Sequence, residues 1–354
     1  MKNLSNLLLE LLQIDSPTGR EQFLSKSVYH RLEKLKAFQL HQVGLSLCYF
    51  GTVDPELPTV GFFGHLDTVQ DQQDDPPCIE DGKVFGCGAS DMKAGLAVMI
   101  RLMMLIEQNQ PKYNTVFVFY DREEGPYLEN GLEPVLNQLG DDIKKIDLAF
   151  MLEPTSNQVQ MGCVGGLHGL VRFAGKSAHS ARPWQGENAL QKSAGLLQRL
   201  SDLKPVEVIS GGLSFFEVIH ATQGSTENRR NSIPGEFVLN LNYRFAPGKP
   251  LEQAKEEFLA LIQGEAEVEF VDQCPSAVAI ENNSLFDSFL QQANCKVESK
   301  QAWTDIARLA VYGIEGVNFG PGQPEQAHQK NESVLIAQLQ ENLEIFSSFL
   351  FFKG

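Results

Sequence analysis

The sequence predicts an α/β protein in which a domain with a mostly parallel central sheet is interrupted by an inserted α+β domain. Short apolar strands alternate with helices near the start of the chain, which is typical of a parallel sheet. In the middle of the chain the strands instead have one apolar and one polar face, and helices return near the end. A length of 354 residues also exceeds one ordinary compact core, so two domains are expected.

The first part of the chain supplies the parallel strands. We expect helices up to residue 14, over 21–35 and over 95–108, and buried strands over 60–64, 116–120 and 147–152. Polar residues follow each of these strands directly. Open α/β sheets bind their ligands at the carboxyl ends of the strands, so these polar residues form the candidate site.

The inserted domain is expected at residues 167–276. Strands over 169–173 and 237–245 occur there together with helices over 188–203 and 250–263. Further helices and a strand over 316–319 follow. The predicted catalytic domain therefore combines residues 1–166 with residues 277–354.

Composition excludes several classes of partner. The net charge of −16 would repel nucleic acids and anionic membranes. No apolar stretch is long enough to span a membrane, and Glu10 interrupts the short N-terminal apolar run, so we expect no signal peptide. The six cysteines form no C-x-x-C pair, which favours reduced thiols and a cytoplasmic location.

Three polar residues suggest a metal site at the end of the strand over 60–64 and in the loop that leads into the next helix. His65 and Asp67 lie two apart, a spacing that points both side chains to one face of an extended chain. His65 could bind a metal while Asp67 orients it, or the pair could be a satisfied histidine beside a turn. Asp91 precedes a helix, where it could bridge two cations or merely cap the helix.

The remaining candidates follow the later strands. Glu123 and Glu124 could divide the work of one metal ligand and one general base, although adjacent acids usually occupy a solvated turn. Glu153 ends the third strand, where a surface turn is the other interpretation. His328 lies in a polar loop, in which a surface histidine is the ordinary case.

Together these residues suit two divalent metal ions. Two Zn²⁺ carry four positive charges, and the carboxylates of Asp91, Glu124 and Glu153 carry three negative charges, so one hydroxide held between the ions would make the site neutral. A ligand set of nitrogen and oxygen without thiolate suits zinc, with Co²⁺ or Mn²⁺ as substitutes.

Longer motifs resemble those of the di-zinc aminoacylase/carboxypeptidase family of metallohydrolases. They are GHLDTV at 64–69, SDMKAG at 90–95, AHSARPW at 178–184, NSIP at 231–234, NYRFAP at 242–247, WTDIAR at 303–308 and VNFGPG at 317–322. The similarity extends over nearly the whole chain and is greatest to the succinyl-diaminopimelate desuccinylase branch of the actinobacterial type. It implies a zinc-peptidase-like catalytic domain and an inserted lid and dimerisation domain.

The resemblance implies the metal ligands. His65 and Glu153 would hold one zinc ion, His328 and Glu124 would hold the other, and Asp91 would bridge the two.

The resemblance also implies the other site residues. Asp67 would orient His65, and Glu123 would take a proton from water and pass it to the leaving amine. His179 would stabilise the oxyanion in the site of the partner subunit of a homodimer. The substrate-binding residues would be Asn231, Arg182, Arg244 and Gly320.

The implied substrate is a small N-acyl amino acid with several carboxylates. The branch that the motifs match acts on N-succinyl-LL-2,6-diaminopimelate, releasing succinate and LL-2,6-diaminopimelate for lysine and diaminopimelate biosynthesis. Cys87 stands where the family usually has arginine or another polar residue, and residues 162–166 lack an arginine of the enterobacterial enzymes. Acetylornithine or acetyl-lysine deacetylase, or a related dipeptidase, therefore stays open. An inactive binding protein is disfavoured because every metal and acid–base position is filled.

Overall fold

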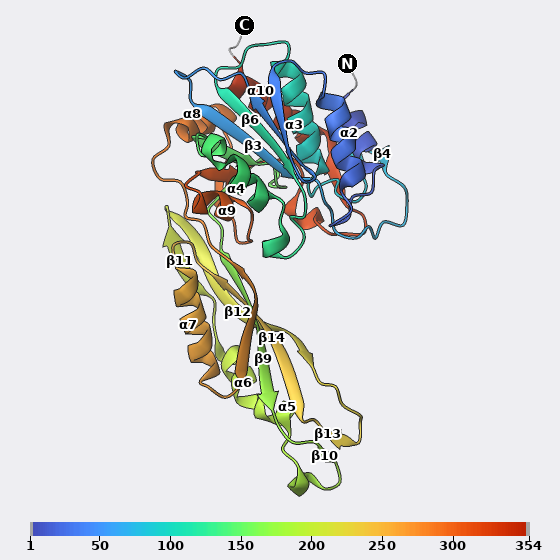
Figure 1. The fold of residues 1–354 in the computed structure, drawn as a ribbon, viewed down its shortest axis with the longest axis vertical. Coiled ribbons are helices and arrows are strands. Elements are labelled where there is room, and N and C mark those ends of the chain that lie inside the picture. The colour runs from blue at the N-terminus through green and yellow to red at the C-terminus, as the bar shows by residue number, and fades with distance from the viewer. Residues whose placement is uncertain (1–2, 352–354) are drawn as a thin grey trace. The chain divides into compact units, whose positions relative to one another are not determined.

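The computed structural model describes residues 3–351 and divides into two compact units (Figure 1). The first contains the chain up to Met161, residues Ile280–Glu298 and the chain from Arg308 onward, and the second contains Gly162–Ala279 and Ser299–Ala307.

Residues 299–307 lie in the second unit, whereas the domain boundaries expected from the sequence placed them in the catalytic domain. They belong to the second unit because the side chain of Gln301 forms hydrogen bonds with the backbone N–H and C=O of Phe216, at 3.0 and 2.6 Å. Trp303 adds a bond from Nε1 to the carbonyl of Pro275 at 3.1 Å.

The largest sheet among the described residues lies in the first unit and has eight strands. Their order is β1 (Phe38–Val43), β2 (Ser46–Gly51), β6 (Asn114–Tyr120), β3 (Thr59–His65), β7 (Leu148–Met151), β17 (Gly316–Asn318), β8 (Val159–Met161) and β16 (Val297–Ser299). The central strands β6, β3, β7 and β17 run parallel, which confirms the expected parallel centre. The flanking strands β2 and β8 pair antiparallel, so the sheet as a whole is mixed.

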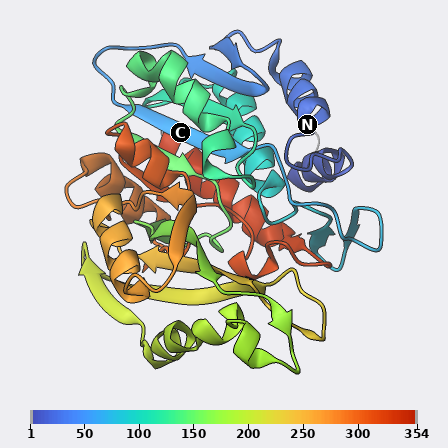
Figure 2. The same cartoon turned by 60° about the horizontal axis from the view of Figure 1, so that its bottom comes forward.

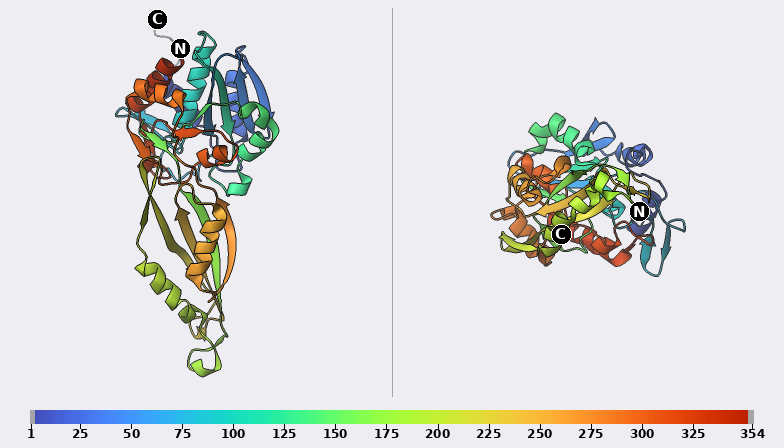
Figure 3. Two further views of the ribbon diagram at one scale, coloured as in Figure 1. Left: turned by 90° about the vertical axis from the view of Figure 1, so that its left-hand side faces the viewer. Right: turned by 90° about the horizontal axis from the view of Figure 1, so that it is seen from below.

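Helices cover both faces of this sheet (Figure 3). On one face lie α1 (Leu4–Leu12), α2 (Gln22–Leu32), α3 (Lys93–Ile106), α8 (Ser284–Ala293) and α10 (Ile336–Leu350), and α4 (Leu132–Ile143) lies on the other. Aromatic side chains fill the first face: Phe62 of β3 stacks on Phe117 at 4.7 Å between centroids and meets Phe346 of α10 at 5.2 Å. Gly64 lets α3 approach, because a Cβ there would lie 2.7 Å from the methyl of Met92.

The second unit is built on an antiparallel sheet of five strands (Figure 2). Their order is β11 (Val206–Ser210), β12 (Leu213–Ser225), β14 (Glu236–Phe245), β9 (Gly165–Ala174) and β15 (Glu267–Cys274). Leu196 and Leu200 of α6 (Ala194–Asp202) and Phe258 of α7 (Leu251–Ile262) share one apolar core with the strands. The burial of β9 and β14 alternates along each strand, as expected for a sheet covered on one face.

One expected helix of the second unit is two helices. The helix predicted over 188–203 divides into α5 (Ala189–Lys192) and α6 at Ser193, whose hydroxyl donates to the carbonyl of Leu190 at 2.7 Å. A serine side chain that bonds local backbone competes with the helical pattern.

Small elements complete the fold. Strands β18 (Ser333–Leu335), β5 (Lys83–Phe85) and β4 (Cys78–Glu80) form a three-stranded sheet, β10 (Ala178–His179) pairs with β13 (Ser232–Ile233), and α9 spans Ile306–Val311. In the part of the chain that the structure describes, no helix is long and apolar enough to cross a membrane. All six cysteines are free.

Candidate metal centre

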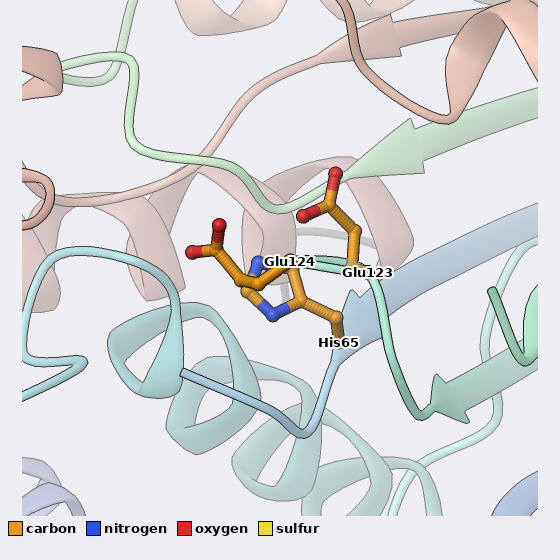
Figure 4. Close-up of side chains that lie close together, drawn as sticks. All are labelled: His65, Glu123 and Glu124. Atoms are coloured by element: carbon orange, nitrogen blue, oxygen red, sulfur yellow. The ribbon is translucent and has the colours of Figure 1, made fainter. Parts of the chain in front are cut away.

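Three of the polar residues singled out above, His65, Glu123 and Glu124, lie close together where parallel strands of the first unit end (Figure 4). His65 is the last residue of β3, and Glu123 and Glu124 follow β6 by three and four positions. Glu153 lies two residues beyond β7. Parallel pairing places the ends of these strands side by side, and this is why polar clusters far apart in the sequence meet.

His65 is oriented by its own loop. Its ring is 1% exposed, and Nδ1 donates to the backbone carbonyl of Asp67 at 2.9 Å. With Nδ1 used in this way, Nε2 points away from that loop and lies 3.2 Å from Oδ1 of Asp91 and 4.0 Å from Oε1 of Glu153. A histidine held by a second hydrogen bond in this manner is typical of metal sites.

His328 enters the same site from the other end of the chain. Its Nε2 lies 2.8 Å from Oε1 of Glu124 and 3.7 Å from Oδ2 of Asp91. The ring is half-exposed, yet it is engaged with two carboxylates, so it is not the plain surface histidine of the alternative interpretation.

Asp91 stands between the two histidines, with one carboxylate oxygen toward each. The N-cap residue of α3 is Met92, and Asp91 does not serve as the helix cap that the sequence left open. Two ligand groups share this carboxylate. The His65 group contains His65, Asp91 and Glu153, and the His328 group contains His328, Asp91 and Glu124; the ligand atoms of each group lie within 4.8 Å of one another.

Asp67 fixes the loop that carries both glutamates. Its carboxylate is fully buried and accepts the backbone N–H of Glu123 and that of Glu124, each at 2.9 Å, and the hydroxyl of Thr18 at 3.0 Å. Burial opposes ionisation, but the hydrogen bonds with His65 and these N–H groups lower the pKa of Asp67. Glu21, also fully buried, accepts the N–H of Arg122 at 3.3 Å just before the same loop.

The carboxylates raise the pKa of both histidines. Burial favours neutral His65, but its hydrogen bonds with Asp67 and Asp91 hold its pKa well above the ordinary value. The hydrogen bond with Glu124 raises the pKa of His328 to about 9. The group of side chains therefore strongly favours positive charge, which a bound cation provides.

Two buried residues near the candidate ligands, Glu332 and Lys93, were given no role by the sequence. Glu332 is 2% exposed and accepts three backbone N–H groups of the loop before α3, and burial raises its pKa to about 7. Lys93 is 2% exposed, donates from Nζ to the carbonyl of Ile14 at 2.8 Å, and has a pKa lowered by burial to about 8. Glu332 lies in a polar segment and Lys93 begins an apolar helix, and only their distance of two to four residues from a proposed ligand could have singled them out.

Four of the predicted residues lie in the second unit. His179 and Arg182 are exposed on the segment around β10, and Nδ1 of His179 accepts the N–H of Ala181 at 3.1 Å. Asn231 is exposed, and its carbonyl accepts the N–H of Ser180 at 3.0 Å. Arg244 is half-buried on β14, where the absence of a side chain at Gly166 leaves room for its guanidinium.

Gly320 lies in the first unit, next to a ligand. Its N–H donates to the hydroxyl of Thr155 at 3.1 Å, and its carbonyl accepts the N–H of Asn157 at 3.2 Å. A Cβ at position 320 would lie 2.5 Å from the carbonyl oxygen of Glu153. These contacts give Gly320 a structural place beside Glu153, and its binding of substrate stays a prediction.

The donor set fits divalent metal. Each group offers one imidazole and two carboxylates, with no thiolate among the candidate ligands, and this combination is typical of catalytic zinc and of its Co²⁺ and Mn²⁺ substitutes. Glu123 lies near His65 and Glu124 in a further cluster, so a carboxylate outside the two groups stands next to them.

Comparison with known proteins agrees with this chemistry. The model of "Peptidase family M20/M25/M40" matches residues 61–351. A Mycobacterium tuberculosis protein named "Putative succinyl-diaminopimelate desuccinylase DapE" is 32% identical, covering 81% of this chain and 80% of its own length. "Succinyl-diaminopimelate desuccinylase" of Corynebacterium glutamicum is 29% identical, covering 97% and 95%.

A solved structure shares the fold. The crystal structure of a tripeptidase from Staphylococcus aureus superposes with a TM-score of 0.81 at 19% identity, covering 98% of this chain and 97% of that one. At this identity the likeness concerns the fold alone. The match of the family model over most of the chain, together with the relative of 32% identity, shows that the chain belongs to peptidase family M20/M25/M40, a family of metal-dependent hydrolases of amide bonds, and the two candidate ligand groups agree with this.

Proposed function

We propose that this protein removes the N-acyl group of an acylated amino acid, and that its substrate is N-succinyl-LL-2,6-diaminopimelate, cleaved to succinate and LL-2,6-diaminopimelate. The observation that carries the proposal is the carboxylate of Asp91, whose two oxygens face His65 and His328. The choice of the succinyl substrate draws support from the names of the two relatives, at 32% and 29% identity.

The two ligand groups would hold two zinc ions, with Co²⁺ or Mn²⁺ as substitutes. His65, Asp91 and Glu153 would bind one ion, and His328, Asp91 and Glu124 the other. When bound, such ions would lower the pKa of water from 15.7 to roughly 7 and would polarise the acyl carbonyl.

Glu123 is the proposed proton carrier. Its backbone is fixed by Asp67, while its side chain reaches the cluster without being a member of either ligand group. Its carboxylate takes the proton of the attacking water and delivers it to the nitrogen of the departing amine. Asp67, which bonds both the loop and His65, keeps this geometry in place.

The second unit would supply the dimer interface and three of the substrate contacts, and Gly320 of the first unit would supply the fourth. Since Nδ1 of His179 accepts a backbone N–H, neutral His179 carries its proton on Nε2, which is then a donor for the developing oxyanion in the partner's site. Arg244, Arg182 and Asn231 would bind the carboxylates of the substrate, for which arginine is suited.

The test is hydrolysis of several amides side by side with added zinc. Succinyl-diaminopimelate should be cleaved with the largest kcat/KM, ahead of acetylornithine, acetyl-lysine and simple dipeptides. A larger kcat/KM for acetylornithine or a dipeptide would assign the protein to the alternative branch. Absence of hydrolysis of every amide by the zinc-loaded protein would contradict the proposal.

A further inference from the structure

Glu332 is a buried carboxylate that serves no step of the proposed mechanism. Its Oε2 accepts the backbone N–H of Gly88 at 2.8 Å, and its Oε1 accepts the N–H groups of Ser90 and Asp91 at 2.8 and 2.9 Å. Its side chain is therefore bonded to the loop that carries the shared ligand. Glu332 is in none of the clusters of candidate ligands found among the described residues.

The backbone on either side of Glu332 strengthens this connection. The carbonyl of Glu332 accepts the N–H of Gly86 at 3.1 Å, and β18 continues the pairing by placing Ser333 opposite Phe85. Ser90 is also held from a second point, because its hydroxyl donates to the carbonyl of Gln323 at 2.9 Å. The loop before α3 is thus joined to residues 323–335 along its length.

The same segment carries His328, four residues before Glu332. One short piece of chain therefore supplies the histidine of the His328 group and holds the backbone of Asp91, the carboxylate that both groups share. His65 ends β3 and Glu153 follows β7, so neither ligand lies on the segment 323–335 that carries Glu332 and His328. The two ligand groups thus depend unequally on this carboxylate.

We infer that Glu332 is a positioning residue that sets the separation of Asp91 and His328, so that its replacement weakens the His328 metal site more than the His65 site. The inference rests on the proposed function, because it takes both groups to hold metal. Hydrogen-bonded partners behind the ligands of a metal site commonly change its affinity or activity by 10–100-fold.

The variant Glu332→Gln tests this with little change of shape. An amide keeps one acceptor oxygen but turns its NH₂ group toward at least one backbone N–H, so one or two of the three bonds are lost. The full-length wild type should bind two Co²⁺ ions in equilibrium dialysis. The variant should keep one ion with near wild-type affinity and bind the second about 10–100-fold more weakly, with a changed visible spectrum of the second Co²⁺.

Ser25→Ala is the matched control for general destabilisation. Ser25 is 3% exposed in α2, and its hydroxyl donates to the carbonyl of Leu45 at 2.6 Å, so the control also removes a buried bond to backbone. It should lower the Tm without changing the binding of either ion. In activity, Glu332→Gln should lower kcat with little change in KM, and the control should change neither.

The outcomes separate this inference from the proposed function. A wild type that binds no Co²⁺ or Zn²⁺ contradicts the proposed function. A wild type with two ions and a Glu332→Gln variant with the same two affinities and spectrum contradicts the inference alone, as does equal weakening of both sites. If Glu332→Gln does not fold, hydrogen exchange of the wild type and of Glu332→Asp is compared. Amides of Gly88, Ser90 and Asp91 that are protected in the wild type and lose protection in Glu332→Asp support the inference. Amides that are unprotected in the wild type contradict the inference.

Discussion

Nε2 of His328 lies 2.8 Å from Oε1 of Glu124, although 204 residues separate them along the chain. The contact requires the C-terminal part of the chain to return to the sheet formed by the N-terminal part. Strand β17 makes that return by pairing in parallel with β7. The second unit is therefore inserted, in the sequence, between the two segments of chain that carry the candidate ligands.

Replacement of Glu123 tests the proposed proton carrier. Glu123→Gln should leave metal binding intact and lower kcat by about 10²–10⁴-fold, the usual contribution of a general base. Steady-state kinetics with zinc-loaded protein measures this. Glu129→Gln, an exposed acid in the next turn, is the control. Turnover of Glu123→Gln at the parent rate would remove Glu123 from the mechanism.

Replacement of Asp67 tests the loop that it holds. Asp67→Asn turns an NH₂ group toward the N–H of Glu123 or of Glu124, so it should lower stability by about 1–3 kcal/mol and kcat by about 10–100-fold. Urea unfolding and kinetics measure the two effects. Thr18→Val removes a single hydrogen bond to the same carboxylate and should have a smaller effect on both. Equal effects of the two variants would argue against this role.

Removal of metal should destabilise the first unit. Asp91, Glu124 and Glu153 crowd together at the site, and their repulsion is relieved by bound cations. A chelator should lower the Tm of the first unit, and zinc at about 100 times its Kd should restore roughly 2.7 kcal/mol. Calorimetry resolves the transition. In Asp91→Asn the chelator should lower the Tm much less than in the wild type. An equal decrease in Tm in both proteins would show that the stabilising metal binds elsewhere.

Stability should depend on pH through Glu133, which belongs to none of the clusters of candidate ligands among the described residues. Burial opposes ionisation of Glu133, but hydrogen bonds from Tyr312 at 2.7 Å and Arg308 at 2.5 Å lower its pKa. A lowered folded pKa means that the stabilisation is present above the unfolded pKa, near 4.3, and is lost as pH falls through the folded value. Urea unfolding should show a gap between wild type and Glu133→Gln at pH 7 that narrows toward pH 3.

The exposed Glu56→Gln is the control for that experiment, and its small difference from wild type should not change with pH. A gap for Glu133→Gln that stays constant between pH 7 and pH 3 would show that the ionised carboxylate is not the source of the stabilisation.

Arg244 tests the substrate assignment. Arg244→Ala should lower kcat/KM for succinyl-diaminopimelate by roughly 10–150-fold. This corresponds to the loss of a charge-assisted hydrogen-bonded pair worth about 1.5–3 kcal/mol. Arg172→Ala, on the neighbouring strand β9 and paired with Glu269 at 3.3 Å, is the matched control. Unchanged kinetics in Arg244→Ala would exclude Arg244 from recognition of the substrate.

The elements that position the metal centre could be predicted because local signals agree there. Val60, Phe62 and other apolar residues mark β3 as buried, and the polar cluster at His65 marks its end. Parallel pairing then brings separate strand ends together without further information. The candidate ligands His65, Glu124 and Glu153 are close in the structure for this reason, whereas Asp91 and His328 reach the same place from loops.

Tertiary contacts decide what the sequence could not indicate. Helical spacing continues through Ser193, and only the bond of its hydroxyl to Leu190 shows where the helix divides. Residues Gln301 and Trp303 bond to the second unit through single side chains that have no periodic pattern. Glu332 stands in a polar stretch, and nothing local distinguishes a buried carboxylate from a solvated one.

The closeness of Gly320 to the backbone of Glu153 has a consequence for mutational tolerance. Any side chain at position 320 must displace the strand end that carries a candidate ligand, whereas Gly140 has no neighbour nearer than 3.9 Å to an added Cβ. In a library of random variants selected for growth that depends on this protein, position 140 should accept many amino acids and position 320 only glycine. The pattern of survivors would then map the supports of the metal centre without any measurement of metal.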